Sequence, residues 1–198
     1  MKLKIRNARL SFPDLFEATQ YQGQGPFNYG ATLLGADDDG AQVSLDEGKT
    51  WQPFKTGIDK ALDEVARGQW AAKAGAHLAG IKGNSQKCCF VDGNTKAYDG
   101  YSGKWALSAK RPQDKGAPLV IDEAKNIVSP KSGKVYAGCY VNATVEVWAQ
   151  DNSYGKGIRA TLVGVQFAKA GDAFGGGAAP NADDFDEITD GAGADALV

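Results

Sequence analysis

Residues 136–167 read YAGCYVNATVEVWAQDNSYGKGIRATLVGVQF, and this stretch decides the fold. From Cys139 to Trp148, small or aliphatic side chains alternate with larger and mostly polar ones, which is the period of a half-buried β-strand. The segment 151–157 is rich in Asn, Asp and Gly, residues that tolerate the positive φ angles of a hairpin turn. The stretch therefore predicts two long strands joined by a polar turn, with one apolar and one polar face.

Two large aromatic side chains, Tyr140 and Trp148, fall on the polar face of the first of these strands. An aromatic ring among polar neighbours can stack against a flat ligand, and nucleic-acid bases are such ligands. If the N-terminal segment or the helix instead covers these two rings, the stacking role passes to Tyr98, Tyr101 or Tyr154.

The remainder of the chain predicts further short strands and one main helix. Alternating patterns place strands at 2–10, 27–34, 87–91, 104–111 and 119–122. Pro13 predicts the end of the first strand, because proline cannot donate to a strand ladder. Apolar residues recur at helical spacing over 53–74, with Thr56 and Asp59 as a capping pair, Gly75 as the stop and His77 in the loop that follows.

The charges are divided unevenly along the 198 residues. Seven of the 24 acidic residues follow Lys169, the last basic residue, so residues 1–169 carry 22 basic and 17 acidic groups, a balance of +5. A basic body with an acidic tail is typical of many nucleic-acid-binding proteins, although a solubilising tail on an ordinary domain has the same pattern. We expect one folded domain over 1–169 and a flexible Gly-rich linker with a disordered acidic tail over 170–198.

No enzyme signature is present in the sequence. It has no Gly-rich phosphate loop, no Gly-x-Ser-x-Gly elbow, no His-Glu-x-x-His motif and a single histidine. The three cysteines lack metal-ligand spacing and are expected to be buried free thiols, and no cofactor is expected. A β-barrel structural or interaction protein stays open as an alternative, as does a metal-dependent nuclease. Without an apolar run of about 18 residues, we expect no membrane span and a cytoplasmic location.

Basic and aromatic residues interleave in the predicted domain. A cationic groove that follows phosphates, combined with aromatic faces that stack bases at about 1–3 kcal/mol per base, binds single strands without sequence preference. The candidate nucleic-acid-binding residues are Tyr101, Lys104, Lys110, Arg111, Lys131, Lys134, Tyr140, Trp148, Tyr154, Lys156 and Arg159. The candidate autoregulatory and partner-binding tail residues are Asp183, Asp184, Phe185, Asp186, Glu187 and Asp190.

Several sequence runs resemble a bacteriophage family of single-stranded-DNA-binding proteins. These runs are ARLSFPDLF at 8–16, GCYVN at 138–142, GIRATL at 157–162 and GVQF at 164–167. The resemblance implies a mainly β fold, an OB-fold-like five-stranded barrel with a helix packed at one end. It also implies a role in phage DNA replication or recombination in the infected host, with an acidic tail that recruits replisome proteins. From its charge alone, the tethered tail is expected to compete with DNA phosphates.

The resemblance leaves some properties of this chain open. Single-stranded DNA is the expected partner, with double-stranded DNA bound more weakly, and the oligomeric state is not determined. The chain ends in Ala196-Leu197-Val198 and lacks the terminal phenylalanine common in such proteins, so the tail's partner is not determined either.

Overall fold

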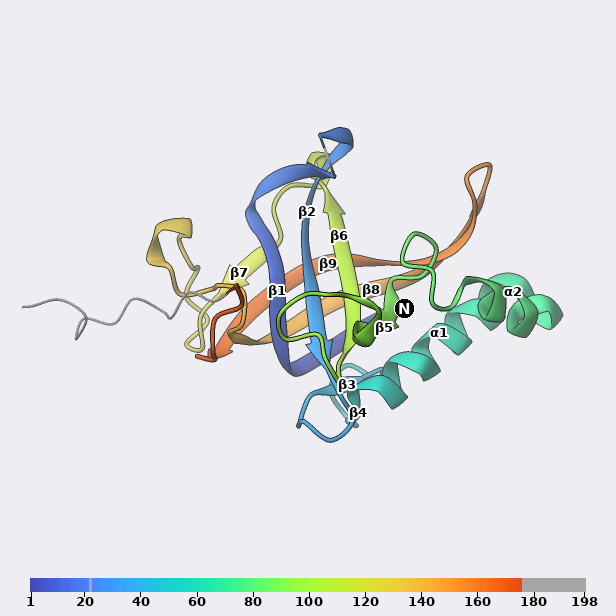
Figure 1. Cartoon of the computed structure of the whole chain (residues 1–198), viewed down its shortest axis with the longest axis horizontal. Coiled ribbons are helices and arrows are strands. Elements are labelled where there is room, and N and C mark those ends of the chain that lie inside the picture. The colour runs from blue at the N-terminus through green and yellow to red at the C-terminus, as the bar shows by residue number, and fades with distance from the viewer. Residues whose placement is uncertain (22, 176–198) are drawn as a thin grey trace, which may run out of the picture.

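The computed structural model describes residues 1–21 and 23–175 (Figure 1). This part of the chain contains nine strands, two α-helices and short 3-10 turns. The strands are β1 (Lys2–Tyr21), β2 (Gln24–Gly35), β3 (Gln42–Ser44), β4 (Gln52–Pro53), β5 (Phe90–Asp92), β6 (Trp105–Pro112), β7 (Leu119–Ile121), β8 (Tyr140–Asn152) and β9 (Gly155–Lys169). The helices are α1 (Phe54–Trp70) and α2 (Ala74–Ile81).

Five strands close into a ring. β1 pairs with β2, β2 with β6, β6 with β9, β9 with β8, and β8 returns to β1. The β6–β9 contact is parallel and the other four are antiparallel. The predicted mainly β, OB-fold-like five-stranded barrel with one main helix is therefore confirmed.

The long hairpin β8–β9 forms one wall of the barrel, as its alternating pattern predicts. Its inward positions Val141, Val145 and Val147 are fully buried and belong to a single core that also takes in Phe54 and Ile58 of α1. Helix α1 thus packs its apolar stripe against the barrel and leaves its polar face exposed.

The predicted end of the first strand at Pro13 is wrong, because β1 continues to Tyr21. Its pairing with β2 shifts register between Ser11 and Asp14. Pro13 lies within this irregularity, where the ladder does not need the N–H that proline lacks. The first half of β1 pairs with β8 and β3, and the second half pairs with β2. One long strand therefore connects the β8 side of the ring to the β2 side.

The predicted helix boundaries also need correction. Helix α1 ends at Trp70, and after a 3-10 turn the chain enters α2, which contains both Gly75 and His77. The break comes at Ala71, whose φ of +45° is incompatible with a continuing helix. Gly75 is tolerated inside α2 because its neighbours Leu78 and Ile81 bury the helix against the core.

The predicted capping pair at the start of α1 is wrong as well. Thr56 donates from its backbone N–H and its hydroxyl to the carboxylate of Asp37, at 3.1 and 2.7 Å. Asp59 instead binds Lys55 and Lys82. The helix start is therefore held by a residue 19 positions earlier, which a local capping motif does not reveal.

Residues 171–175, which their composition assigns to the linker, contact the barrel. Arg9 donates to the carbonyl of Asp172 at 2.6 Å, and its guanidinium lies 4.7 Å from the ring centre of Phe174. The predicted tail residues lie in 176–198, outside the described part of the chain.

All three cysteines are buried free thiols, as predicted. Within residues 1–21 and 23–175, neither helix has the length and apolarity needed to cross a membrane.

Candidate nucleic-acid interface

A band of polar side chains crosses the outer surface of the ring. Trp148 on β8 donates from Nε1 to Oγ1 of Thr161 on β9 at 3.1 Å, and Thr161 pairs in register with Lys110 of β6. Farther along β6, Ser108 shares a hydrogen bond of 3.2 Å with Thr32 of β2. We call these five residues the outer band. With neighbouring strands about 4.8 Å apart, the path around the ring from β8 through β9, β6 and β2 to β1 is roughly 19 Å long.

An aromatic cluster lies at the β1 end of the outer band. The ring of Phe12 lies 5.0 Å from that of Tyr98 and 6.3 Å from that of Tyr101, in edge-to-face contacts. Phe12 is 52% exposed and Tyr98 54%, whereas Tyr101 is 3% exposed and donates from its hydroxyl to Ser11, the β1 neighbour of Thr32. Two open rings therefore rest on a buried third.

The predicted site residue Tyr101 thus supports the cluster from below. Burial raises the pKa of its hydroxyl, so the group stays a neutral hydrogen-bond donor. In this arrangement its ring offers no open face to a base, while Phe12 and Tyr98 do.

Phe12 is held in an uncommon backbone conformation. Its φ is +47°, in the left-handed region that bulky residues rarely adopt. Such a conformation costs on the order of 1–3 kcal/mol and persists only where the surrounding structure imposes it, which occurs most often at functional sites. The fold therefore keeps an apolar ring in solvent at a conformational cost.

At the other end of the outer band, Trp148 is 44% exposed and pairs across the hairpin with Arg159. The Arg159 guanidinium donates to Oε1 of Gln150 at 3.1 Å and to the carbonyl of Gln86 at 2.7 Å. These contacts fix a cation beside an exposed indole, which is the combination that binds a phosphate next to a stacked base.

The tip of the β8–β9 hairpin projects beyond the barrel (Figure 1). Tyr154 at the tip is 91% exposed. The base of the tip is fixed by Asp151, which forms an ion pair with Lys156 and accepts a hydrogen bond from Nε1 of Trp70 at 3.0 Å. The Lys156 contact, and to a lesser degree the Trp70 contact, lower the pKa of Asp151, so the carboxylate stays ionised near neutral pH.

Other predicted site residues are engaged by their own chain. Lys104 pairs with Asp39 at 2.7 Å, and Lys134 pairs with Glu123 at the same distance. Arg111 donates to backbone carbonyls of the turn after β6, where it stabilises that turn.

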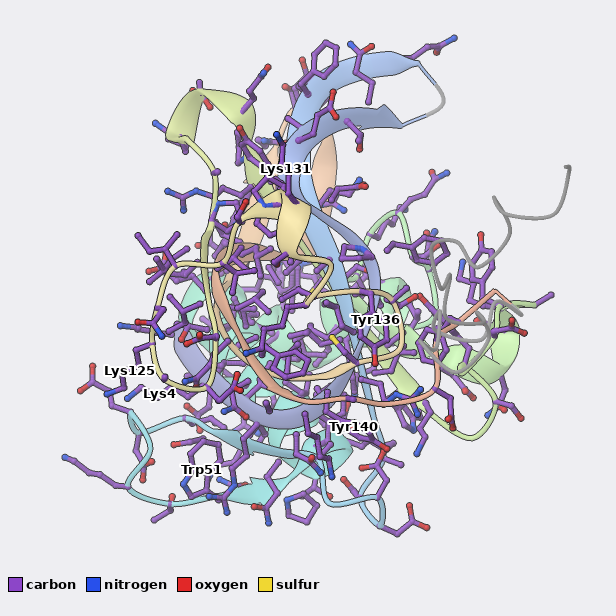
Figure 2. All side chains as sticks on the ribbon, turned by 90° about the vertical axis from the view of Figure 1, so that its left-hand side faces the viewer. Lys4, Trp51, Lys125, Lys131, Tyr136 and Tyr140 are labelled. Atoms are coloured by element: carbon purple, nitrogen blue, oxygen red, sulfur yellow. The ribbon has the colours of Figure 1, made fainter. Side chains whose placement is uncertain are left out.

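Tyr140 and Lys131 lie on the side of the barrel that also carries Lys4 and Trp51 (Figure 2). Tyr140 is half-buried between two cations, with the Arg9 guanidinium 4.9 Å and the Lys169 ammonium 4.4 Å from its ring centre. Lys131 is exposed in a short turn. Neither belongs to the outer band.

The structure thus adds Phe12 and Ser108 to the candidate interface, together with Thr32, the buried hydrogen-bond partner of Ser108. Hydroxyl side chains on strands give no sequence signal of their own. Only the pairing of β2 with β6 shows that Thr32 and Ser108 are adjacent. Phe12 directly precedes Pro13, where the sequence predicts the end of a strand, and no local pattern indicates that its ring is exposed. Among the residues that the structure describes, no group of three or more His, Cys, Asp or Glu side chains could hold a metal ion.

A closed ring of five strands, crossed by a polar band with exposed aromatic rings at its ends, is typical of barrels that bind single-stranded nucleic acid. A family model described as the ssDNA-binding protein of Enterobacter phage Enc34 matches residues 1–197, and the chain belongs to this family. It is 40% identical over 190 residues to putative protein p50 of Acyrthosiphon pisum secondary endosymbiont phage 1. The aligned region covers 96% of this chain and 95% of that protein.

Two solved structures share the fold. The single-stranded DNA-binding protein of bacteriophage Enc34 has a TM-score of 0.64 at 25% identity, over 93% of this chain and 90% of that one. The same protein in complex with ssDNA has a TM-score of 0.66 at 24% identity, over 88% of this chain and 89% of that one.

Proposed function

We propose that this chain is a non-enzymatic, largely sequence-independent single-stranded-DNA-binding protein of phage DNA replication or recombination. The observation that carries the proposal is the outer band, with exposed rings at both of its ends. Lys110 and Arg159 would contact phosphates, and Phe12, Tyr98 and Trp148 would stack bases. Every base has a π-face, so this mode of binding needs no particular sequence.

The same arrangement favours single strands over duplexes. In a duplex the bases are already stacked on one another, and only the phosphates are available to the cations of this surface. Double-stranded DNA is therefore expected to bind more weakly and with the stronger dependence on salt that purely ionic contacts give.

The tail contributes regulation in this proposal. The N–H of Gly175 donates to the Asp99 carboxylate at 2.9 Å, so the tail begins next to Tyr98, at the β1 end of the interface. Six carboxylates follow within 23 residues, and the tether holds them at millimolar-scale effective concentration. They would compete with DNA phosphates, and once displaced they would recruit replication proteins.

Binding of fluorescein-labelled oligothymidine, measured by anisotropy over a series of salt concentrations, tests the interface. Lys110→Gln should weaken binding by roughly threefold to tenfold and make the slope of log K against log salt shallower by about 0.7. Lys60→Gln, on the exposed face of α1, is the matched control and should bind as the wild type does. No binding by the wild type at low salt, or equal effects of the two substitutions, would overturn the proposal.

A further inference from the structure

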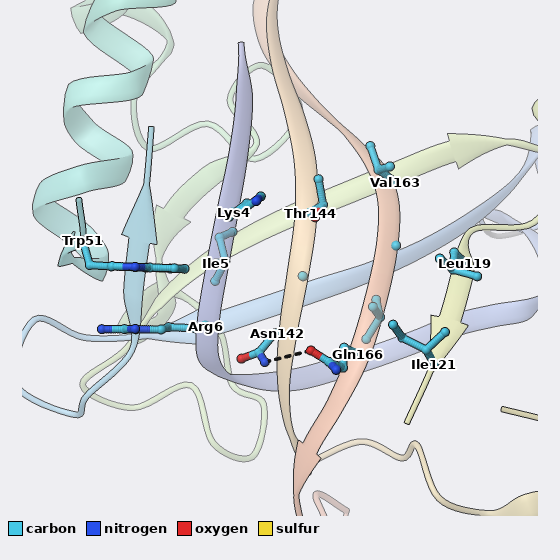
Figure 3. Close-up of a pocket in the computed structure, with 13 residues that line it drawn as sticks. Lys4, Ile5, Arg6, Trp51, Leu119, Ile121, Asn142, Thr144, Val163 and Gln166 are labelled. Carbon is cyan, nitrogen blue, oxygen red and sulfur yellow. Dashed lines mark hydrogen bonds between the residues drawn. The ribbon is translucent and has the colours of Figure 1, made fainter. Parts of the chain in front are cut away.

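A groove lies on the wall of the barrel that faces away from β2 and β6 (Figure 3). It shares β8 and β9 with the outer band, but lies farther from the hairpin tip than Trp148 and Thr161 do. It crosses the outer faces of β1, β8 and β9, from Trp51 on one side to Leu119 and Ile121 of β7 on the other, and has a volume of about 380 Å³. Figure 3 shows β2 and β6, the strands that carry much of the outer band, passing behind it. DNA bound over β2 and β6 would therefore leave the groove open.

The lining of the groove combines two cations with apolar walls. Lys4 and Arg6 line it, and none of its lining residues is acidic. Its apolar lining includes Val163, half-buried, and Leu119, which is 55% exposed. Such a surface fits a ligand that carries negative charge and bulky apolar groups on the same short segment.

A peptide fits this chemistry better than a nucleobase does. The Arg6 guanidinium lies 4.1 Å from the ring centre of Trp51 and covers one face of it, while Gln42 accepts from Nε of Arg6 at 2.8 Å and fixes this arrangement. A base would have to displace the guanidinium to stack on that face. An aliphatic or phenyl side chain can enter against Val163 and Leu119 without disturbing it.

We propose that the groove docks residues 183–188 of this same chain, Asp-Asp-Phe-Asp-Glu-Ile, when DNA occupies the outer band. The segment places four carboxylates around Phe185 and Ile188, the charge and apolar pattern that the groove complements. This inference goes beyond the proposed function, because it gives the displaced tail a second binding site on the protein, with which a recruited replication protein would compete for the same segment.

The path of the last described residues supports docking within one molecule. Gly171 exchanges two hydrogen bonds with the hydroxyl of Tyr136, at 2.8 and 3.1 Å, and packs against the ring of Tyr140. Tyr140 precedes Asn142 by two residues on the same face of β8, roughly 7 Å apart, and Asn142 lines the groove. Phe185 follows Gly175 by ten positions, which reach at most about 35 Å when extended.

NMR titration of ¹⁵N-labelled residues 1–175 with a synthetic peptide of residues 181–192 tests the proposal, in the presence and absence of oligothymidine. We expect chemical-shift changes at Leu119, Thr144 and Val163, which persist when oligothymidine is bound. A peptide carrying Phe185→Ala has the same charge and should bind at least about fivefold more weakly, because the apolar contact is lost.

Two protein variants locate the peptide. Lys4→Glu should abolish the shifts, whereas Lys2→Glu, a charge reversal on the same strand outside the groove, should leave them intact. Leu119→Ala removes an exposed side chain from the groove wall and should weaken binding even if Lys4→Glu does not fold. Shifts confined to Thr32, Ser108 and Lys110, equal responses of the two charge reversals, or no shifts at all would overturn the proposal.

The test of tail docking does not depend on whether the protein binds DNA as proposed. The peptide titration without DNA needs no DNA binding, and oligothymidine affinity of residues 1–175 is measured separately. In the full-length chain, oligothymidine should produce the same groove shifts at every protein concentration, because the segment and groove belong to one molecule. Shifts that grow with protein concentration would overturn docking within one chain.

Discussion

Phe12 combines an exposed ring with a strained backbone, and its two properties can be separated by substitution. Phe12→Ala removes the ring and keeps the strain, so DNA affinity should fall by about 1–3 kcal/mol if one base stacks there. Phe12→Gly should lose the same affinity yet be more stable than Phe12→Ala, because glycine adopts positive φ at no steric cost. Oligothymidine titration and urea unfolding measure the two effects.

A matched control for Phe12 is Ile127→Ala, which removes another apolar side chain that is 82% exposed. It lies between β7 and β8, away from the outer band, and should leave DNA affinity unchanged. Equal affinity of Phe12→Ala and the wild type would contradict a stacking role for this ring.

Tyr140 and Trp148 show what sequence reasoning can establish for single residues. Both point to the outer face of β8, as the alternation predicts, because side-chain direction in a strand depends only on position. Their surroundings differ. Arg9 and Gly171, both distant in the sequence, pack against Tyr140, whereas Trp148 remains exposed. Exposure therefore depended on contacts between remote segments, which a local pattern does not contain.

The two helices are joined by an ionic contact that should make stability depend on pH. Asp59 accepts from Lys55 at 2.6 Å and from Lys82, just after α2, at 3.0 Å. Burial opposes ionisation of Asp59, but the two lysines outweigh it and lower its pKa. Because the folded-state pKa is depressed, this contribution to stability is present above the unfolded value near 4 and is lost as pH falls through the folded pKa.

Asp59→Asn tests this contact. We expect the variant to be less stable than the wild type at pH 7, by roughly 1 kcal/mol or less since the pairs are partly exposed, and the difference to shrink toward pH 3. Urea unfolding at both pH values measures it. A difference that is constant between them would show that the charge of Asp59 is not responsible.

The β8–β9 hairpin is fixed to α1 through the Trp70–Asp151 hydrogen bond. Trp70→Phe keeps an aromatic ring but removes the Nε1–H donor, so stability should fall by about 1–2 kcal/mol from the lost hydrogen bond and reduced packing. Amides at 151–156 should exchange with solvent faster than in the wild type, while those of the buried β8 core stay protected. Unchanged exchange at the tip would indicate that the hairpin holds itself in place.

At the level of elements, a helix or strand boundary with a local cause is predictable from the sequence, and one that depends on a distant residue is not. The β8–β9 hairpin was predicted correctly because both its period and its turn are local. The continuation of β1 past Pro13 depends on a register shift against β2, and the start of α1 depends on Asp37 in an earlier turn. Such causes arise only in the assembled fold.

For the whole molecule, the tail sets the net charge. The full chain has a formal charge of −2, and removing 176–198 takes away six acids and leaves +4. We expect the truncated protein to bind oligothymidine more tightly at low salt, with the advantage fading as salt screens the carboxylates. Anisotropy titrations of both proteins measure this, and equal or weaker binding after truncation would contradict autoregulation by the tail.

The position of the truncation matters because of the contacts made by residues 172–175. Deleting 172–198 also removes the Asp172 and Phe174 contacts with Arg9, and this shorter protein should be less stable than residues 1–175. Thermal unfolding compares the two. If their midpoints coincide, the contacts of these four residues contribute no stability.

The closure of the ring has a consequence for synthesis in the cell. Lys2 pairs with Glu146, so the first strand to leave the ribosome waits for a partner made 144 residues later. At translation rates of about 5–20 residues per second, the unpaired edge of β1 is exposed for roughly 7–30 seconds on each nascent chain. Early pairing with β2 and β3 would cover one edge of β1, while the other edge stays open to chaperones until β8 emerges.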